Sequence, residues 1–165
     1  MKIINQIQDL TNYIQDLKLS NKTIGLVPTM GALHKGHMSL IGKARQENDI
    51  VVCSVFVNPI QFNNKEDLEK YPRNVEKDAQ LLEENGCDIM FSPIAQEVYK
   101  EEPTEQFSFG SLEAVMEGKQ RPGHFNGVAI IVSRLFNWVS PNRAYFGEKD
   151  FQQLAIIRAM VDDLN

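Results

Sequence analysis

The sequence is poor in cysteine, in glycine and proline, and in long hydrophobic runs, and each shortage excludes a class of protein. Two cysteines in 165 residues are too few for a disulfide scaffold. Cys53 lies inside the apolar run VVCSVFV and Cys87 just before another apolar run, so we expect buried, reduced thiols. Ten glycines and seven prolines exclude a collagen-like or low-complexity chain. No stretch approaches the roughly 20 apolar residues of a membrane-spanning helix. The polar start MKIINQIQDL is unlike a signal peptide, so we expect a cytoplasmic protein.

An excess of positive charge is also absent. The 17 Lys and Arg residues are outnumbered by 22 Asp and Glu residues, which gives a net charge of −5, and the basic residues are not clustered. This balance argues against a nucleic-acid partner. It leaves an anionic substrate open, because helix N-termini and a few local cations can hold phosphate. The length and the 42% hydrophobic content suit one domain over residues 1–165.

Apolar periodicity predicts strands that alternate with helices. Helical spacing is found in the segments Ile4–Leu17, His37–Asn48, Val75–Asn85, Leu112–Glu117, Gly127–Val139 and Phe151–Leu164. Strand character is found in the segments Thr23–Thr29, Asp49–Asn58, Asp88–Ser92, Phe107–Phe109 and Arg143–Phe146. Such alternation favours an α/β domain with a mostly parallel sheet. Binding sites in these sheets lie at the carboxyl ends of the strands, so residue clusters that follow strands should converge.

The first such cluster is PTMGALHKGH, which ends in His34 and His37 at a predicted helix start. Free backbone N–H groups there attract anions, and histidine can donate to phosphate and stabilise developing charge. The spacing also permits metal ligation, although the H-E-x-x-H pattern is missing. The alternative interpretation is a glycine turn with two solvated histidines.

Three further clusters each have a structural alternative. In FVNPIQF, Gln61 suits a ligand with hydroxyl or carboxylate groups, unless it is merely a polar loop residue. In RPGHFNG, His124 belongs to a helix-entry turn or completes a zinc site with His34 and His37. In FGEKDFQQL, Lys149 can balance phosphate charge and Asp150 can accept from ribose, unless both lie on an exposed helix start. Neither G-x-x-x-x-G-K-[ST] nor G-x-G-x-x-G occurs, so any nucleotide must be held in another way.

Taken together, PTMGALHKGH, FVNPIQF, RPGHFNGV and YFGEKDFQQL resemble the pantoate–β-alanine ligase family over essentially the whole chain. The segment from His34 to His37 is also similar to the His-x-Gly-His signature of nucleotidyltransferases. The resemblance implies a Rossmann-like, doubly wound sheet with helices on both faces, and a homodimer. It further implies two reactions: pantoate and ATP give pantoyl adenylate and pyrophosphate, and β-alanine then gives pantothenate and AMP. Mg²⁺ is expected with ATP, but no acidic cluster identifies its protein ligands.

The resemblance also implies roles for individual residues. His37 would be the proton donor and, with His34, would contact the phosphates. Gln61 would bind pantoate and border β-alanine, and Gln153 would bind pantoate. The ATP site would comprise two segments, Met30, Gly31, Ala32, Leu33, His34, Lys35, Gly36 and His37, and Gly147, Glu148, Lys149 and Asp150.

One departure from the family pattern affects the expected activity. Family members continue into a smaller C-terminal domain with a Ser-Arg-rich loop, whereas this sequence stops at Asn165. We therefore expect a largely present pantoate pocket with reduced or absent turnover. Alternatives that stay open are another nucleotidyltransferase, a zinc hydrolase and a non-catalytic binding domain.

Overall fold

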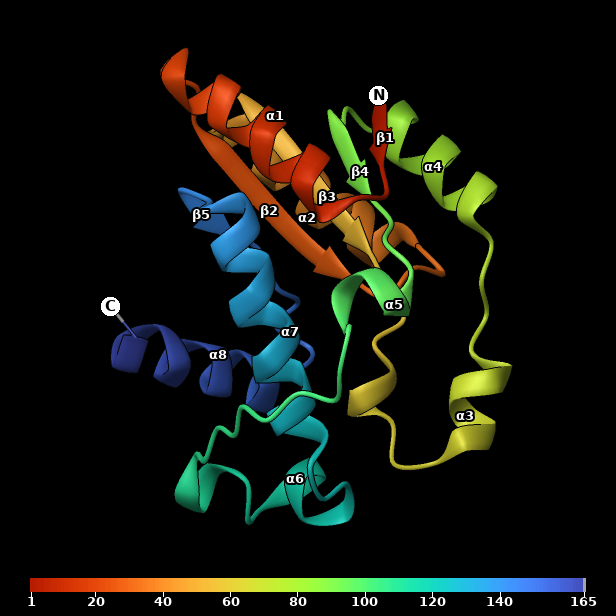
Figure 1. The fold of residues 1–165 in the computed structure, drawn as a ribbon, viewed down its shortest axis with the longest axis vertical. Coiled ribbons are helices and arrows are strands. Elements are labelled where there is room, and N and C mark those ends of the chain that lie inside the picture. The colour runs from red at the N-terminus through yellow and green to blue at the C-terminus, as the bar shows by residue number, and fades with distance from the viewer. Residues whose placement is uncertain (165) are drawn as a thin grey trace.

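A five-stranded parallel sheet forms the centre of the protein (Figure 1). The computed structural model describes residues 1–164. The strands are β1 (Lys2–Ile4), β2 (Ile24–Thr29), β3 (Ile50–Val55), β4 (Ile89–Phe91) and β5 (Arg143–Ala144). Their order is β1-β4-β3-β2-β5, and each neighbouring pair is parallel. The predicted α/β class is confirmed, and the sheet is parallel throughout these pairs.

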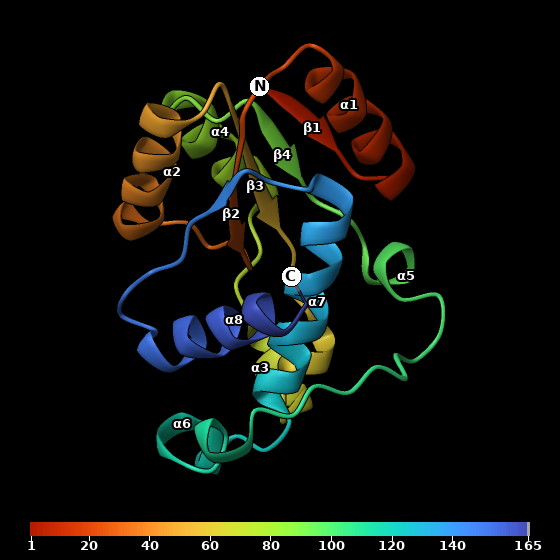
Figure 2. The same ribbon diagram turned by 90° about the vertical axis from the view of Figure 1, so that its left-hand side faces the viewer.

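Helices cover both faces of the sheet. The helices are α1 (Ile7–Leu19), α2 (Lys35–Glu47), α3 (Lys65–Lys70), α4 (Val75–Glu84), α5 (Ala95–Val98), α6 (Met116–Gln120), α7 (His124–Val139) and α8 (Phe151–Leu164), with 3₁₀ turns η1 (Pro59–Gln61) and η2 (Gly110–Leu112). One core cluster joins α1, α7 and α8 to the sheet, and a second joins α2 and α4 to its other face. Figure 2 shows α2 and α4 on one side and α1 and α7 on the other. The doubly wound arrangement is therefore confirmed. No helix within residues 1–164 is long and apolar enough to cross a membrane.

The apolar run of β3 is buried between these two layers. Residues 51–56 are all buried, as expected for a parallel strand covered on both faces. Cys53 lies in this run and Cys87 just before β4, and both are free, buried thiols, which confirms the prediction for them. Burial raises the pKa of both thiols, that of Cys87 to about 12.

The strand order reverses beside β2, and this reversal positions the site. From β2 the chain moves outward to β3 and then to β4, whereas β5 returns to the opposite side of β2. Parallel α/β sheets bind ligands outside the carboxyl ends of the strands at such a reversal. The segments that follow β2, β3 and β5 therefore meet at one edge of the sheet.

Several predicted elements differ from the observed ones in type or bounds; for example, α7 begins three residues before the predicted Gly127, and β3 ends three residues before the predicted Asn58. Ile4 belongs to β1 rather than to the first helix, where it is buried and pairs with Phe91. Helix α2 begins at Lys35, two residues earlier than expected, because His34 caps it. The predicted strand Phe107–Phe109 is irregular, since the backbone N–H groups of its two phenylalanines donate to side chains. The predicted helix Leu112–Glu117 is replaced by η2 and α6.

Candidate active site

A cavity of about 270 Å³ at the carboxyl edge of the sheet gathers residues from three of the four sequence clusters. Met30 and His37 come from the segment after β2, and Gln61 from η1 after β3. Asp150 and Gln153 come from the segment after β5 and from the first turn of α8. The expected convergence of these clusters is therefore present in the fold.

The turn after β2 is held by a buried carboxylate from α4. Gly31 has a φ of +83° and Ala32 one of +50°, so two consecutive residues adopt left-handed conformations. The side chain of Asp78 accepts from the backbone N–H of Ala32 at 3.0 Å and from that of Leu33 at 2.8 Å. Asp78 is 2% exposed, and a Cβ at Gly31 would lie 2.9 Å from its Oδ2. These contacts offset the backbone strain and fix the turn that leads to the histidines.

The two histidines of this segment cap α2 reciprocally. His34 Nδ1 accepts from the backbone N–H of Gly36 at 3.1 Å, and His37 Nδ1 accepts from the N–H of His34 at 3.3 Å. Their ring centroids are 4.1 Å apart. Since both Nδ1 atoms act as acceptors, the proton of each neutral ring lies on Nε2. Both rings thus offer an Nε2–H donor at a helix N-terminus, which suits an anionic ligand.

The surroundings of His37 favour its neutral form. Burial is the main cause that lowers its pKa below 6.5, and the neighbouring His34 lowers it further. Asp78 and Asp150 oppose this shift by favouring the imidazolium. His37 lines the cavity, whereas His34 is exposed and does not belong to its lining.

The side chain of Gln61 is oriented by buried neighbours. Asn58, 1% exposed, donates through Nδ2 to Gln61 Oε1 at 3.0 Å and to the carbonyl of Gly127 at 3.0 Å. Gly127 lets α7 approach the backbone of η1 closely, because a Cβ at Gly127 would lie 2.8 Å from Gln61 Cα. The donor atom of the Gln61 side chain, Nε2, lies 2.9 Å from Met30 Sδ. The Gln61 nitrogen therefore lies beside Met30, and both residues line the cavity.

His124 supports this turn from α7 and is not part of the cavity lining. It is buried, and its Nδ1 lies 2.9 Å from the carbonyl oxygen of Gln61. Among residues 1–164, no group of three or more His, Cys, Asp or Glu side chains is arranged to hold a metal ion. The alternative of a zinc site built from His34, His37 and His124 is therefore not supported by the geometry.

The segment after β5 contributes two of its predicted residues to the cavity. Asp150 and Gln153 line it, whereas Glu148 and Lys149 are exposed outside that lining. The adjacent Gln152 has a structural role, since its amide accepts from the N–H of Glu117 at 3.0 Å and donates to two carbonyls of the segment before α6. Of the two glutamines in FGEKDFQQL, Gln153 therefore lines the cavity and Gln152 holds the segment before α6.

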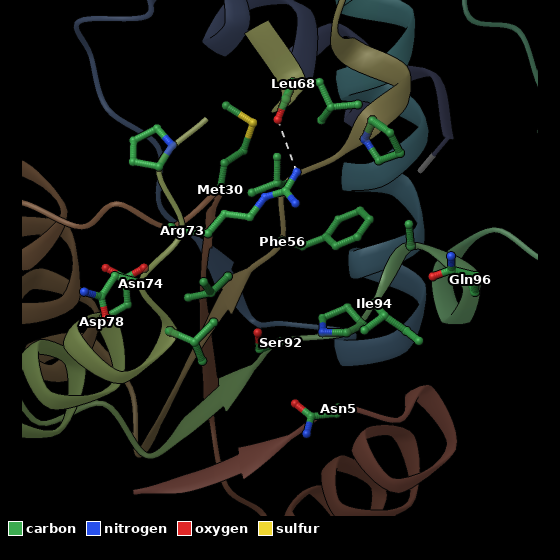
Figure 3. Close-up of a pocket in the computed structure, with 18 of the residues that line it drawn as sticks. Asn5, Met30, Phe56, Leu68, Arg73, Asn74, Asp78, Ser92, Ile94 and Gln96 are labelled. Carbon is green, nitrogen blue, oxygen red and sulfur yellow. Dashed lines mark hydrogen bonds between the residues drawn. The ribbon is translucent and has the colours of Figure 1, made fainter. Parts of the chain in front are cut away.

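A second cavity, of about 740 Å³, lies beside the first (Figure 3). Asn5 reaches it from the end of β1 and Arg73 from the segment before α4. Met30 and Phe56 line both cavities and so lie between them. Of the predicted site residues, Met30 and Gly31 contact this larger cavity. The clustered histidine, carboxylate and amide groups identify the smaller cavity as the candidate active site.

Three residues at the site escaped the sequence analysis as functional candidates. Asp78 lies four positions before the buried Leu82, so a carboxylate on the apolar face of α4 was the available signal. Asn58 stood within FVNPIQF but was interpreted as the residue that ends a strand. Tyr71 also lines the cavity, and no sequence pattern singled it out.

Comparisons with known proteins agree on one family. The profile of the family described as pantoate-beta-alanine ligase matches residues 2–165. Pantothenate synthetase of Porphyromonas gingivalis is 59% identical over 162 residues, which cover 98% of this chain and 58% of the relative. The structure of pantothenate synthetase from Thermus thermophilus has a TM-score of 0.92 at 48% identity, and covers 99% of this chain and 58% of its own.

A further neighbour is pantoate-beta-alanine ligase from Francisella tularensis, described as complexed with beta-gamma ATP and beta-alanine. Its TM-score is 0.95 at 41% sequence identity, and the match covers 99% of this chain and 63% of the neighbour's chain. The chain thus spans 58% of the length of the curated relative from Porphyromonas gingivalis. With a family match over nearly every residue and a shared fold, the chain belongs to the pantoate–β-alanine ligase family.

Proposed function

We propose that this chain is the ATP- and pantoate-binding part of a pantothenate synthetase, and that it activates pantoate as an acyl adenylate. The observation that carries the proposal is the 270 Å³ cavity, where His37, Gln61, Asp150 and Gln153 meet beside the reversal in strand order. A carboxylate and a triphosphate need donors. His37, Gln61 and Gln153 supply them together with the N-terminus of α2, whereas Asp150 is an acceptor. The family and the neighbour described with ATP and β-alanine support the same choice of substrates.

The first step couples the pantoate carboxylate to the α-phosphate of ATP. A carboxylate oxygen attacks phosphorus, the bond to the bridging oxygen of the β-phosphate breaks, and pyrophosphate leaves with that electron pair. Positioning and charge stabilisation dominate such a transfer. We assign the Nε2–H of His37 as donor to the developing charge, since its Nδ1 is engaged by the backbone of His34. His34 and Lys149, both exposed, would contact the outer phosphates.

The second step transfers the pantoyl group to β-alanine. The amine nitrogen attacks the acyl carbon, the bond to the AMP oxygen breaks, and AMP leaves while the amine gives up a proton. Gln61 and Gln153 would hold pantoate through both steps, and Gln61 would also border the β-alanine position. These neutral amides fit a small hydroxy acid better than a second phosphate, which would call for cations.

The residues present fit a magnesium ion that is bound to the triphosphate. Magnesium keeps several waters and binds one or two carboxylates besides phosphate oxygens. Asp150 offers a carboxylate at the cavity, whereas both oxygens of Asp78 already accept backbone N–H groups. When bound, the ion would neutralise charge on the phosphates. The family resemblance also suggests a homodimer, which light scattering on the purified chain would test.

Exchange of labelled pyrophosphate into ATP, with Mg²⁺, tests the proposal most directly. Slow exchange that requires pantoate is the expected result for an adenylating chain with the reduced turnover expected from the sequence. Pantoate binding without exchange would restrict this chain to binding, and the absence of both would overturn the substrate assignment. The matched variant is His37→Asn, whose side-chain oxygen can still accept from His34 but which lacks the Nε2 donor. We expect it to slow exchange by roughly 100-fold or more.

A further inference from the structure

A chain of hydrogen bonds runs from outside the candidate active site to Gln61. Tyr99, at the end of α5, donates its hydroxyl proton to Asn58 Oδ1 at 2.8 Å. Asn58 Nδ2 then donates to Gln61 Oε1 at 3.0 Å. Tyr99 does not belong to the lining of the 270 Å³ cavity, whereas Asn58 and Gln61 do.

The direction of this chain follows from the groups at its ends. The carbonyl of Gly127 can only accept, so the Asn58 atom that faces it must be the nitrogen. Asn58 Oδ1 then faces Tyr99, whose hydroxyl must donate. The second proton of Asn58 Nδ2 goes to Gln61 Oε1, which leaves the Gln61 nitrogen on the side of Met30, a residue that also lines the cavity. Each amide orientation thus determines the next one.

The protein group that the Gln61 nitrogen contacts is a weak acceptor. Nε2 lies 2.9 Å from the thioether sulfur of Met30, and sulfur is a poor acceptor. A carboxylate or hydroxyl oxygen in the cavity would replace this contact with a stronger bond. The fixed amide therefore favours a ligand that presents an acceptor at this point.

The ring of Tyr99 is itself packed against two other side chains. The guanidinium of Arg134 lies 4.9 Å from the centroid of the Tyr99 ring. The ring centroids of Phe56 and Tyr99 are 6.2 Å apart. Arg134 in turn donates to the carbonyl of Val98 at 2.7 Å and to Glu105 at 2.8 Å. Burial also raises the pKa of Tyr99, so its hydroxyl stays protonated and can donate.

We propose that Tyr99 is a positioning residue for substrate recognition. Together with the Gly127 carbonyl, its hydroxyl holds Asn58 in place, and Asn58 in turn orients the Gln61 amide so that its nitrogen can donate to the carboxylate or hydroxyl oxygens of pantoate. The orientation of the amide stands on the contacts alone. The identity of the ligand rests on the proposed function.

Tyr99→Phe tests this role because it removes the hydroxyl and keeps the ring. The matched control is Tyr145→Phe, which also loses a hydroxyl bonded to two side chains, Asn48 at 2.7 Å and Glu47 at 2.8 Å. Two measurements are made on the ligand-free and ligand-titrated chain: the ¹H–¹⁵N signals of the Gln61 side-chain amide, and calorimetric affinities for pantoate and ATP. Circular dichroism confirms that both variants are folded.

We expect Tyr99→Phe to shift the Gln61 amide signals and to weaken pantoate binding roughly three- to tenfold, with ATP affinity unchanged. Tyr145→Phe should change neither quantity. Unchanged Gln61 signals in Tyr99→Phe would overturn the positioning role, and shifted signals with unchanged pantoate affinity would overturn its effect on recognition. If the unmodified chain does not bind pantoate while the Gln61 signals still respond, the proposed substrate fails and the orientation stands.

Discussion

Replacement of Asp78 should loosen the turn that carries the candidate active-site histidines. Both oxygens of this buried carboxylate accept backbone N–H groups, one from Ala32 and one from Leu33. In Asp78→Asn, the side-chain oxygen can still accept from one of these two N–H groups, but the NH₂ group faces the other N–H, and two donors cannot bond to each other. One bond is then lost, and one buried donor is left without a partner.

The size of the effect follows from these contacts. A hydrogen bond to a buried charged group contributes about 1.5–3 kcal/mol, so Asp78→Asn should lower the free energy of unfolding by about 2–3 kcal/mol. With a urea dependence of about 2 kcal/mol per molar, the midpoint of unfolding should fall by roughly 1 M. Asp78→Ala removes both acceptors and should cost more.

Urea titration followed by circular dichroism measures this change, and Glu76→Gln is the control. Glu76 lies in the same first turn of α4 but is exposed. It therefore has the same favourable interaction with the helix dipole as Asp78 but not the buried hydrogen bonds to Ala32 and Leu33. Its removal should change stability by less than about 0.5 kcal/mol. If Asp78→Asn unfolds at the same urea concentration as the unmodified chain, the assignment of the turn to Asp78 is refuted.

Three further predictions concern the histidines, the packing of α7 and the thiols. Because burial lowers the pKa of His37, this side chain binds a proton more tightly in the unfolded chain than in the folded one. The free energy of unfolding should therefore fall as the pH drops below 7. An NMR titration of His37 with a midpoint at or above the ordinary value of 6.5 would contradict this. Gly127→Ala should lower stability by about 1–3 kcal/mol, since its Cβ would collide with the backbone of Gln61, whereas Gly42→Ala in open space should not; thermal unfolding of the two variants decides. Cys53 and Cys87 should resist an aromatic disulfide reagent until the chain unfolds, and rapid labelling of the native protein would be inconsistent with their burial and raised pKa values.

The alternation of strands and helices was predictable because β2, β3, α4, α7 and α8 have strong local periodicity. The edge strand β1 was not, since Ile4 also fits the helical spacing of Ile7, Leu10 and Ile14. Only its pairing with Phe91 distinguishes the two interpretations. A strand of three residues has too little local pattern to be recognised without its partner.

The candidate site was partly predictable for the same reason. Residues that follow strands, such as His37 and Gln61, could be found from the chain itself, because parallel topology brings such segments together. Asp78 and Tyr99 act on segments far away in sequence, at Ala32 and at Asn58. Their roles depend on a meeting of elements that no local pattern encodes. In contrast, Phe107 and Phe109 look like a strand, but their N–H groups are taken by Asn126 and Glu113.

The placement of β1 beside β4 also constrains the order in which the protein is assembled during synthesis. Strand β1 is made before β2, β3 and β4, yet its residue Lys2 pairs with Ile89. By contrast, Ile24 pairs with Ile50, and the intervening segment contains α2, so this β2–α2–β3 unit needs a much shorter loop to close. We expect folding to begin in that unit and the first-made strand to join the sheet only after β4 has left the ribosome.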